Sequence, residues 1–171
     1  MPKIIETEVP LDALSVGYLK EGAFVDCYYI DIPKEVTLEQ YIQAFYTTFL
    51  FKVERSVLSL VTFTLAKDSE AVDLSLGKTE RYSIWTVEKR KSDQILLCEF
   101  TENTRSWLSV KVIKVEGVIT TRLYFGSVVI PKSVSENGEG NFGFIFHLLG
   151  KFHKVYSKSL LNAAYKKLIL D

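Results

Sequence analysis

The sequence predicts an α+β fold in which one long C-terminal helix packs against an antiparallel sheet. Two observations carry this prediction. Apolar residues recur at helical spacing through residues 141–170, and most of the chain before them reads as strands separated by short turns. A long amphipathic helix needs a broad apolar surface to cover its stripe, and the strands can supply one. We therefore predict one domain, residues 1–171, with a helix layer on a sheet.

The length and charge balance limit the function classes. A chain of 171 residues is most simply one domain, which buries about 70% of the surface that its unfolded chain exposes. Lysine plus arginine and aspartate plus glutamate both number 21, so the formal net charge is zero. A general nucleic-acid binder needs an excess of cations to neutralise phosphates, so we expect no nucleic-acid partner.

The sequence also predicts a cytoplasmic location. No apolar run approaches the roughly 20 residues of a membrane-spanning helix, so we expect no integral membrane segment. The first ten residues lack the apolar core of a signal peptide. Cys27 and Cys98 each lie in a β-like run and are expected to be buried, reduced thiols. No CxxC pair or zinc-type cluster occurs, so we expect neither a metal nor a cofactor.

The first strand and helix have the clearest boundaries. Residues 24–32 are rich in aromatic and β-branched residues and stop at Pro33. Thr37 and Gln40 then have the spacing of a capping box, in which each side chain satisfies a free backbone N–H. We expect the following segment to form one bent helix or two short helices that end near Val61.

Repeated strands fill the middle of the chain. The predicted strands are residues 71–76, 79–89, 94–101, 106–115 and 118–130. Short turns between them favour antiparallel hairpins. Alternation places Leu108, Val110 and Val112 on one face of their strand, and the opposite faces are not wholly polar. Either the sheet is partly covered on both sides or it dimerises. Residues 133–141 are expected to form a loop that leads into the last helix.

Four short segments carry a resemblance to a known superfamily: AFVDCYY at 23–29, RSWL at 105–108, LYFGSVV at 123–129 and FHKVYS at 152–157. With this order of elements, the chain resembles the SRPBCC superfamily of START-like, helix-grip proteins. Within it, the chain is most similar to a family of uncharacterised, mainly bacterial proteins that share a domain of unknown function. The resemblance implies a curved sheet wrapped around the long helix, with a hydrophobic pocket between them. Lipid carriers and cyclases share this fold, so the fold does not select a function.

The favoured hypothesis is a small hydrophobic or amphipathic ligand, such as a lipid, held between the sheet and the helix. The candidate cavity residues are Leu108, Val110, Arg122, Leu123, Phe125, Leu149, Phe152 and Tyr156. A guanidinium suits a ligand carboxylate or phosphate, although a cross-strand ion pair on the outer face explains Arg122 more simply. The aromatic residues Trp85, Trp107, Tyr124 and Phe146 either line the pocket or fill an ordinary core.

Few residues suggest chemistry. His147 and His153 are six positions apart, so they cannot form the i, i+4 pair of a metal site on one helix. His153 could serve as a general base, although packing between helix and sheet explains it more simply. Ser127 lacks the second glycine of a nucleophile elbow and is better explained as a small residue that lets the helix approach the sheet. An inward-facing Asp26 would need a partner or a polar ligand group.

The residues leave three functions open. The first is ligand binding without catalysis, which we favour. The second is a small cyclase- or hydratase-like enzyme, for which the sequence identifies no catalytic residues. The third is a structural or regulatory protein that uses apolar strand residues as a dimer surface. We expect a monomer or a homodimer.

Overall fold

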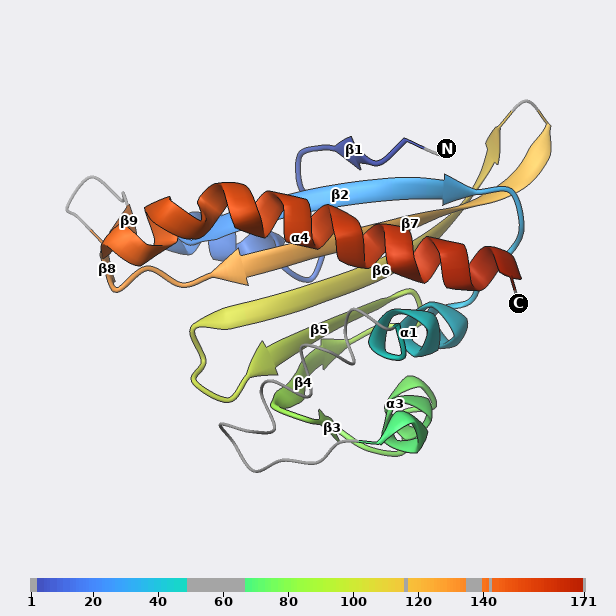
Figure 1. Cartoon of the computed structure of the whole chain (residues 1–171), viewed down its shortest axis with the longest axis horizontal. Helices are drawn as coiled ribbons and strands as arrows, with labels where there is room; N and C mark the ends of the chain where they lie inside the picture. Colours follow the sequence, from blue (N-terminus) through green and yellow to red (C-terminus); the bar gives the residue numbers. More distant parts are fainter. Residues whose placement is uncertain (1–2, 49–66, 116, 135–139, 142, 171) are drawn as a thin grey trace.

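Seven antiparallel strands form one open sheet, and a long C-terminal helix lies across one of its faces (Figure 1). In this computed structural model the backbone is described for residues 3–48, 67–115, 117–134, 140–141 and 143–170, and side chains for the same ranges outside 134–152. The predicted α+β class and the antiparallel hairpins are confirmed. No helix within these ranges is both long enough and apolar enough to cross a membrane.

The strands follow the order β1-β2-β7-β6-β5-β4-β3 across the sheet. Their bounds are β1 Ile5–Glu6, β2 Phe24–Ile32, β3 Arg81–Tyr82, β4 Trp85–Arg90, β5 Gln94–Glu99, β6 Thr104–Val115 and β7 Val118–Val129. A separate pair, β8 (Ser133–Val134) and β9 (Gly140–Asn141), precedes the last helix. The helices are a 3₁₀ helix η1 (Val16–Glu21), α1 (Leu38–Tyr46), α3 (Asp68–Ser75) and α4 (Gly143–Leu170).

The strand at residues 24–32 and the first α-helix begin as predicted, but this strand is the second one, because the short strand β1 precedes it. β2 spans the predicted residues 24–32. The Thr37 hydroxyl accepts from Gln40 N at 3.3 Å, and Gln40 Oε1 accepts from Thr37 N at 3.0 Å, so the capping box is present. The helix ends at Tyr46. The part of the predicted helix between residues 49 and 61 lies outside the described residues.

The prediction of a strand at residues 71–76 is wrong, because this segment belongs to the helix α3. Asp68 and Glu70 lie in its first turn, where negative charge is favourable near the positive end of the helix dipole. Its buried residues Ala71, Leu74 and Ser75 follow the i, i+3, i+4 spacing of a helix face. Over so short a segment, this spacing is easily mistaken for strand alternation.

Two other boundaries differ from the predictions. The single strand expected at residues 79–89 is divided into β3 and β4, because Ser83 has a positive φ of 54° and turns the chain between Tyr82 and Trp85. A serine gives none of the usual sequence signals of a hairpin turn. The loop expected at residues 133–141 instead begins and ends in the short strands β8 and β9.

The two faces of the sheet are covered by different parts of the chain. On the α4 side, Leu108, Val110, Leu123 and Phe125 are buried against residues of α1 and α4. On the opposite side, Trp107, Leu96 and Cys27 are buried with Ala13, and Val9, Leu14, Val16 and Tyr18 of the N-terminal segment pack around them. Coverage of both faces, one of the two predicted alternatives, is therefore confirmed. Val112 is 56% exposed, because the tip of the β6–β7 hairpin projects beyond the neighbouring strands (Figure 1).

Glycine is required at one position of the central sheet. Gly126 on β7 lies opposite Cys27 on β2 and Trp107 on β6. A Cβ atom at this position would lie 2.6 Å from the carbonyl oxygen of Asp26 and 3.1 Å from Cε3 of Trp107. The small residue is therefore needed for close packing within the sheet and against Trp107. Its neighbour Ser127 is the residue that meets α4.

Candidate functional site

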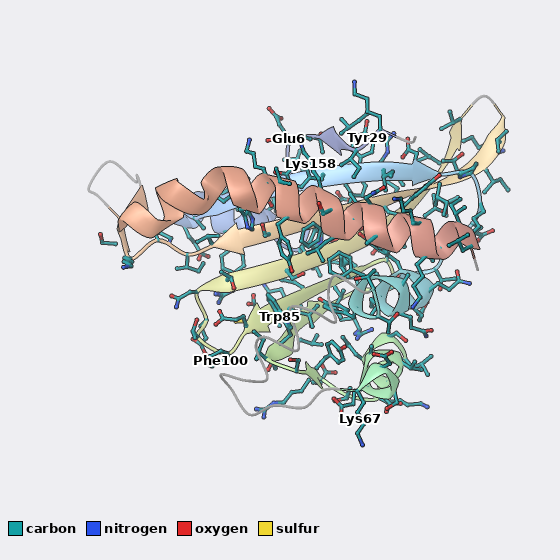
Figure 2. All side chains as sticks on the ribbon, viewed as in Figure 1. Glu6, Tyr29, Lys67, Trp85, Phe100 and Lys158 are labelled. Atoms are coloured by element: carbon teal, nitrogen blue, oxygen red, sulfur yellow. The ribbon has the colours of Figure 1, made fainter. Side chains whose placement is uncertain are left out.

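A cavity of about 240 Å³ lies between the sheet and α4. Aromatic and aliphatic side chains form much of its wall, including Phe45 of α1, Phe125 of β7 and Leu160 of α4. Trp85 of β4 also lines it and lies on the face of the sheet that α4 covers (Figure 2). This volume is slightly below the roughly 300–1,000 Å³ typical of pockets for drug-sized ligands. The cavity therefore suits a small molecule.

Of the residues predicted to line the cavity, some do so and others lie elsewhere in the fold. Phe125 and Tyr156 line the cavity. Leu108, Val110 and Leu123 lie in the same core but are not among the described lining residues. The side chains of Leu149, Phe152, Phe146 and His147 lie outside the described residues. Of the other aromatic candidates, Trp107 and Tyr124 pack on the opposite face of the sheet.

Arg122 lies on that opposite face, where it is held in a cross-strand ion pair. It is directly opposite Asp31 in the β2–β7 register, and two parallel hydrogen bonds of 2.8 and 2.9 Å join the guanidinium to the carboxylate. The guanidinium also lies 3.9 Å from the ring centroid of Tyr29. The hydrogen bond to Asp31 raises the pKa of Arg122, so the charge is secure. This geometry matches the simpler of the two interpretations of Arg122.

Three polar side chains from β2, β7 and α4 meet at the cavity. Asp26 and Ser127 are paired directly across β2 and β7. Asp26 Oδ1 accepts from the backbone N–H of Ser127 at 2.8 Å and from its hydroxyl at 2.6 Å. His153 of α4 places Nε2 2.7 Å from the Ser127 oxygen and 3.3 Å from Asp26 Oδ2. Asp26 is only 7% exposed, so the expected need for a partner at an inward aspartate is confirmed.

The number of available protons determines the direction of these hydrogen bonds. The Ser127 hydroxyl has one hydrogen, which it donates to Asp26. Its oxygen therefore accepts from His153, and Nε2 carries the hydrogen in this contact. In an acyl-transfer triad, the acid and the nucleophile contact different nitrogens of the imidazole. Here both contact Nε2, so the imidazole does not draw the proton from Ser127, and this arrangement does not activate a serine nucleophile.

Two further polar groups lie buried at the cavity wall. Trp85 Nε1 and Ser157 Oγ are inaccessible to solvent and have no hydrogen-bond partner within the described part of the chain. Ser157 is 1% exposed. The sequence interpretation did not single out this serine. Its position one helical turn after His153 is the signal that could have identified it, because residues four apart share a helix face.

A larger groove of about 970 Å³ lies beside the cavity and shares Ile84, Glu99 and Arg105 with it. Three of its polar residues are bonded to one another: Tyr18 donates to Glu88 Oε1 at 2.6 Å, and Arg105 Nε donates to Tyr18 and Glu88 at 3.1 Å each. Burial, followed by the hydrogen bond to Glu88, raises the pKa of Tyr18 to about 12.

The described residues contain no group of three or more histidine, cysteine, aspartate or glutamate side chains suited to a metal ion. The site therefore consists of an apolar cavity, a polar cluster at its wall and two lining groups, Trp85 Nε1 and Ser157 Oγ, that have no hydrogen-bond partner among the described residues. The chain matches no protein-family model, no curated protein and no solved structure.

Proposed function

We propose that this chain is a helix-grip protein that binds a small hydrophobic or amphipathic ligand between its sheet and α4. The observation that carries the proposal is the composition of the cavity wall, in which buried polar atoms stand among apolar side chains. Protein interiors are closely packed, and buried polar groups are almost always hydrogen-bonded. A bound molecule would fill the space and supply partners for Trp85 Nε1 and Ser157 Oγ.

The strand order supports the helix-grip assignment. After β2, the chain passes through α1 and α3 to the far edge of the sheet and returns strand by strand from β3 to β7. The last strand then pairs with β2, so the ends of this path meet beneath α4. This order lets one sheet cover the apolar side of one long helix, which is the arrangement that a helix-grip cavity requires.

A filling substitution at Ser157 tests the proposal. Ser157→Leu places an apolar side chain in the cavity, whereas Ser159→Leu makes the same change at an exposed position on the same helix. The purified protein is denatured and the released small molecules are identified by mass spectrometry. We expect a molecule released from the wild type and from Ser159→Leu, and at least tenfold less from Ser157→Leu.

A second readout covers a ligand that is lost during purification. Thermal unfolding is followed with a panel of short-chain lipids and monocyclic aromatic compounds. Binding to the folded state alone raises the midpoint, by an amount that depends on ligand concentration. If no compound raises the midpoint of thermal unfolding, and the denatured wild type releases no molecule, ligand binding in this cavity is excluded.

The polar cluster favours a second candidate, a small cyclase- or hydratase-like enzyme. His153 lines the cavity and is fixed by Ser127 and Asp26, so its imidazole could act on a bound substrate as a general acid or base. Such a group contributes roughly 10²–10⁴-fold to a rate. With a substrate identified, His153→Gln should lower kcat by about this factor and leave binding nearly unchanged. Equal kcat in both proteins would exclude this role.

A further inference from the structure

We infer that the ligand of the sheet–α4 cavity is an uncharged molecule that presents an oxygen acceptor, such as a ketone, an ester or an alcohol. This inference rests on the proposed function and specifies the chemical class of the ligand. It follows from the charged groups at the wall of the cavity and from the donors that have no partner there.

Among the described residues that line the cavity, no cation is free to pair with an anionic ligand. Arg105 is bonded through Nε to Glu88 and Tyr18, and another of its nitrogens donates to the carbonyl of Glu102. His153 lies beside the buried carboxylate of Asp26. Of the described lining residues, the other charged one is Glu99, which is itself an anion. A ligand carboxylate or phosphate would therefore be desolvated among carboxylates without a counterion of its own, which is strongly unfavourable.

The donors at the wall disfavour a cationic ligand. The indole nitrogen of Trp85 can only donate a hydrogen bond. An ammonium group also only donates, so it would leave this buried nitrogen without an acceptor.

An uncharged oxygen acceptor matches the hydrogen-bonding chemistry of both buried groups. A carbonyl oxygen has two lone pairs and can accept from Trp85 Nε1 and from the Ser157 hydroxyl. A ligand hydroxyl can accept from the first and either donate to or accept from the second. The apolar wall formed by Phe45, Phe125 and Leu160 would then contact the hydrocarbon part of the molecule. The lining therefore suits one polar end and one apolar body.

Four probes that share one aromatic ring test the inference: ethylbenzene, acetophenone, benzoate and benzylammonium. Affinities are measured by NMR titration of the full chain. One hydrogen bond contributes a net 0.5–1.5 kcal/mol, so acetophenone should bind about 2- to 10-fold more tightly than ethylbenzene. Benzoate and benzylammonium should bind more weakly than either. Ser157→Ala and Trp85→Phe should each move the acetophenone-to-ethylbenzene ratio towards one, whereas Ser159→Ala should not change it.

The two tryptophans supply an internal control in the same spectra. Trp107 lies on the opposite face of the sheet, where its Nε1 donates to Gln94 Oε1 at 3.0 Å. Acetophenone should therefore move the indole N–H signal of Trp85 downfield and leave that of Trp107 in place. Trp85→Phe assigns the two signals.

The outcomes separate this inference from the proposed function. If ethylbenzene binds and acetophenone binds no more tightly, the cavity holds ligands but the inferred polar contact is wrong. If benzoate or benzylammonium binds most tightly, the inference that the ligand is uncharged is wrong. If none of the four probes binds, the inference fails, and the proposed function is then decided by the released-molecule and thermal-unfolding measurements.

Discussion

The hydroxyl oxygen of Ser127 lies 2.7 Å from Nε2 of His153, and this contact joins β7 to α4 at the wall of the cavity. Asp26, paired with Ser127 across β2 and β7, accepts the hydroxyl proton and lies within 3.3 Å of the same imidazole nitrogen. One buried carboxylate thus fixes both side chains. The cluster holds the helix in register with the sheet and leaves a cavity beside it.

Loss of the buried carboxylate of Asp26 should destabilise the protein more than loss of the half-buried carboxylate of Asp31. Asp26→Ala leaves the Ser127 hydroxyl and N–H without their acceptor, so we expect a loss of about 1–3 kcal/mol in the free energy of unfolding. Asp31→Ala on the same strand breaks the more exposed ion pair with Arg122 and should cost at most about 1 kcal/mol. Urea unfolding measures both. An equal or larger loss for Asp31→Ala would contradict the role of Asp26.

The contact between Ser127 and His153 should appear as an energetic coupling. Ser127→Ala, His153→Gln and the double variant form a thermodynamic cycle. Because the two side chains share one hydrogen bond and one acceptor, we expect an interaction energy of about 0.5–3 kcal/mol. Additive effects, with no coupling beyond the error of urea unfolding, would show that the side chains act independently.

The sequence predicts those elements whose signals are local. The strand at 24–32 stops before Pro33, and the capping box at Thr37 marks the next helix start, so both features follow from neighbouring residues. The break at Ser83 does not follow from the sequence because serine gives no usual turn signal, and α3 does not because its helix-face spacing covers too few residues to be told from a strand. The resemblance to helix-grip proteins supplied the hypothesis of a cavity.

The candidate site was harder to predict, because it depends on contacts between distant parts of the chain. Asp26 and Ser127 are separated by 101 positions and meet only through the register of β2 and β7. His153 joins them only because of how α4 is rotated about its axis. One signal was present in the sequence: Asp26 is in alternation with Tyr28 and Ile30, so a charge occupies the apolar face of its strand.

Gly126 should not tolerate a side chain. In Gly126→Ala the new Cβ would lie 2.6 Å from a backbone oxygen of β2, which cannot move without disturbing the sheet. We expect a loss of about 1–3 kcal/mol in the free energy of unfolding. Gly17→Ala is the control, because no atom lies within 4 Å of the added Cβ, and its stability should change by no more than about 0.5 kcal/mol. A tolerated Gly126→Ala would contradict the described packing of β2, β7 and Trp107.

The buried thiol should make the protein less stable in alkali. Burial, followed by the charge of Asp26, raises the pKa of Cys27 from 9.0 to about 12 in the folded chain. Above pH 9 the folded state then holds a proton that the unfolded state releases. The contribution of the protonated thiol to the free energy of unfolding is therefore complete below pH 9 and is lost as the pH rises towards 12. Relative to Cys27→Ala, the wild type should lose stability between pH 9 and pH 11. If Tm fell equally with pH in the wild type and in Cys27→Ala, the raised pKa of Cys27 would be contradicted.

The most direct test of the account is to locate a bound molecule in the cavity. Crystals of the wild type, of Ser157→Leu and of Ser159→Leu are soaked in iodobenzene, and the iodine is located by its anomalous scattering. The account predicts an iodine peak between α4 and β7, beside Phe125 and Ser157, in the wild type and in Ser159→Leu but not in Ser157→Leu. Iodine found only on the surface, or unchanged in Ser157→Leu, would contradict it.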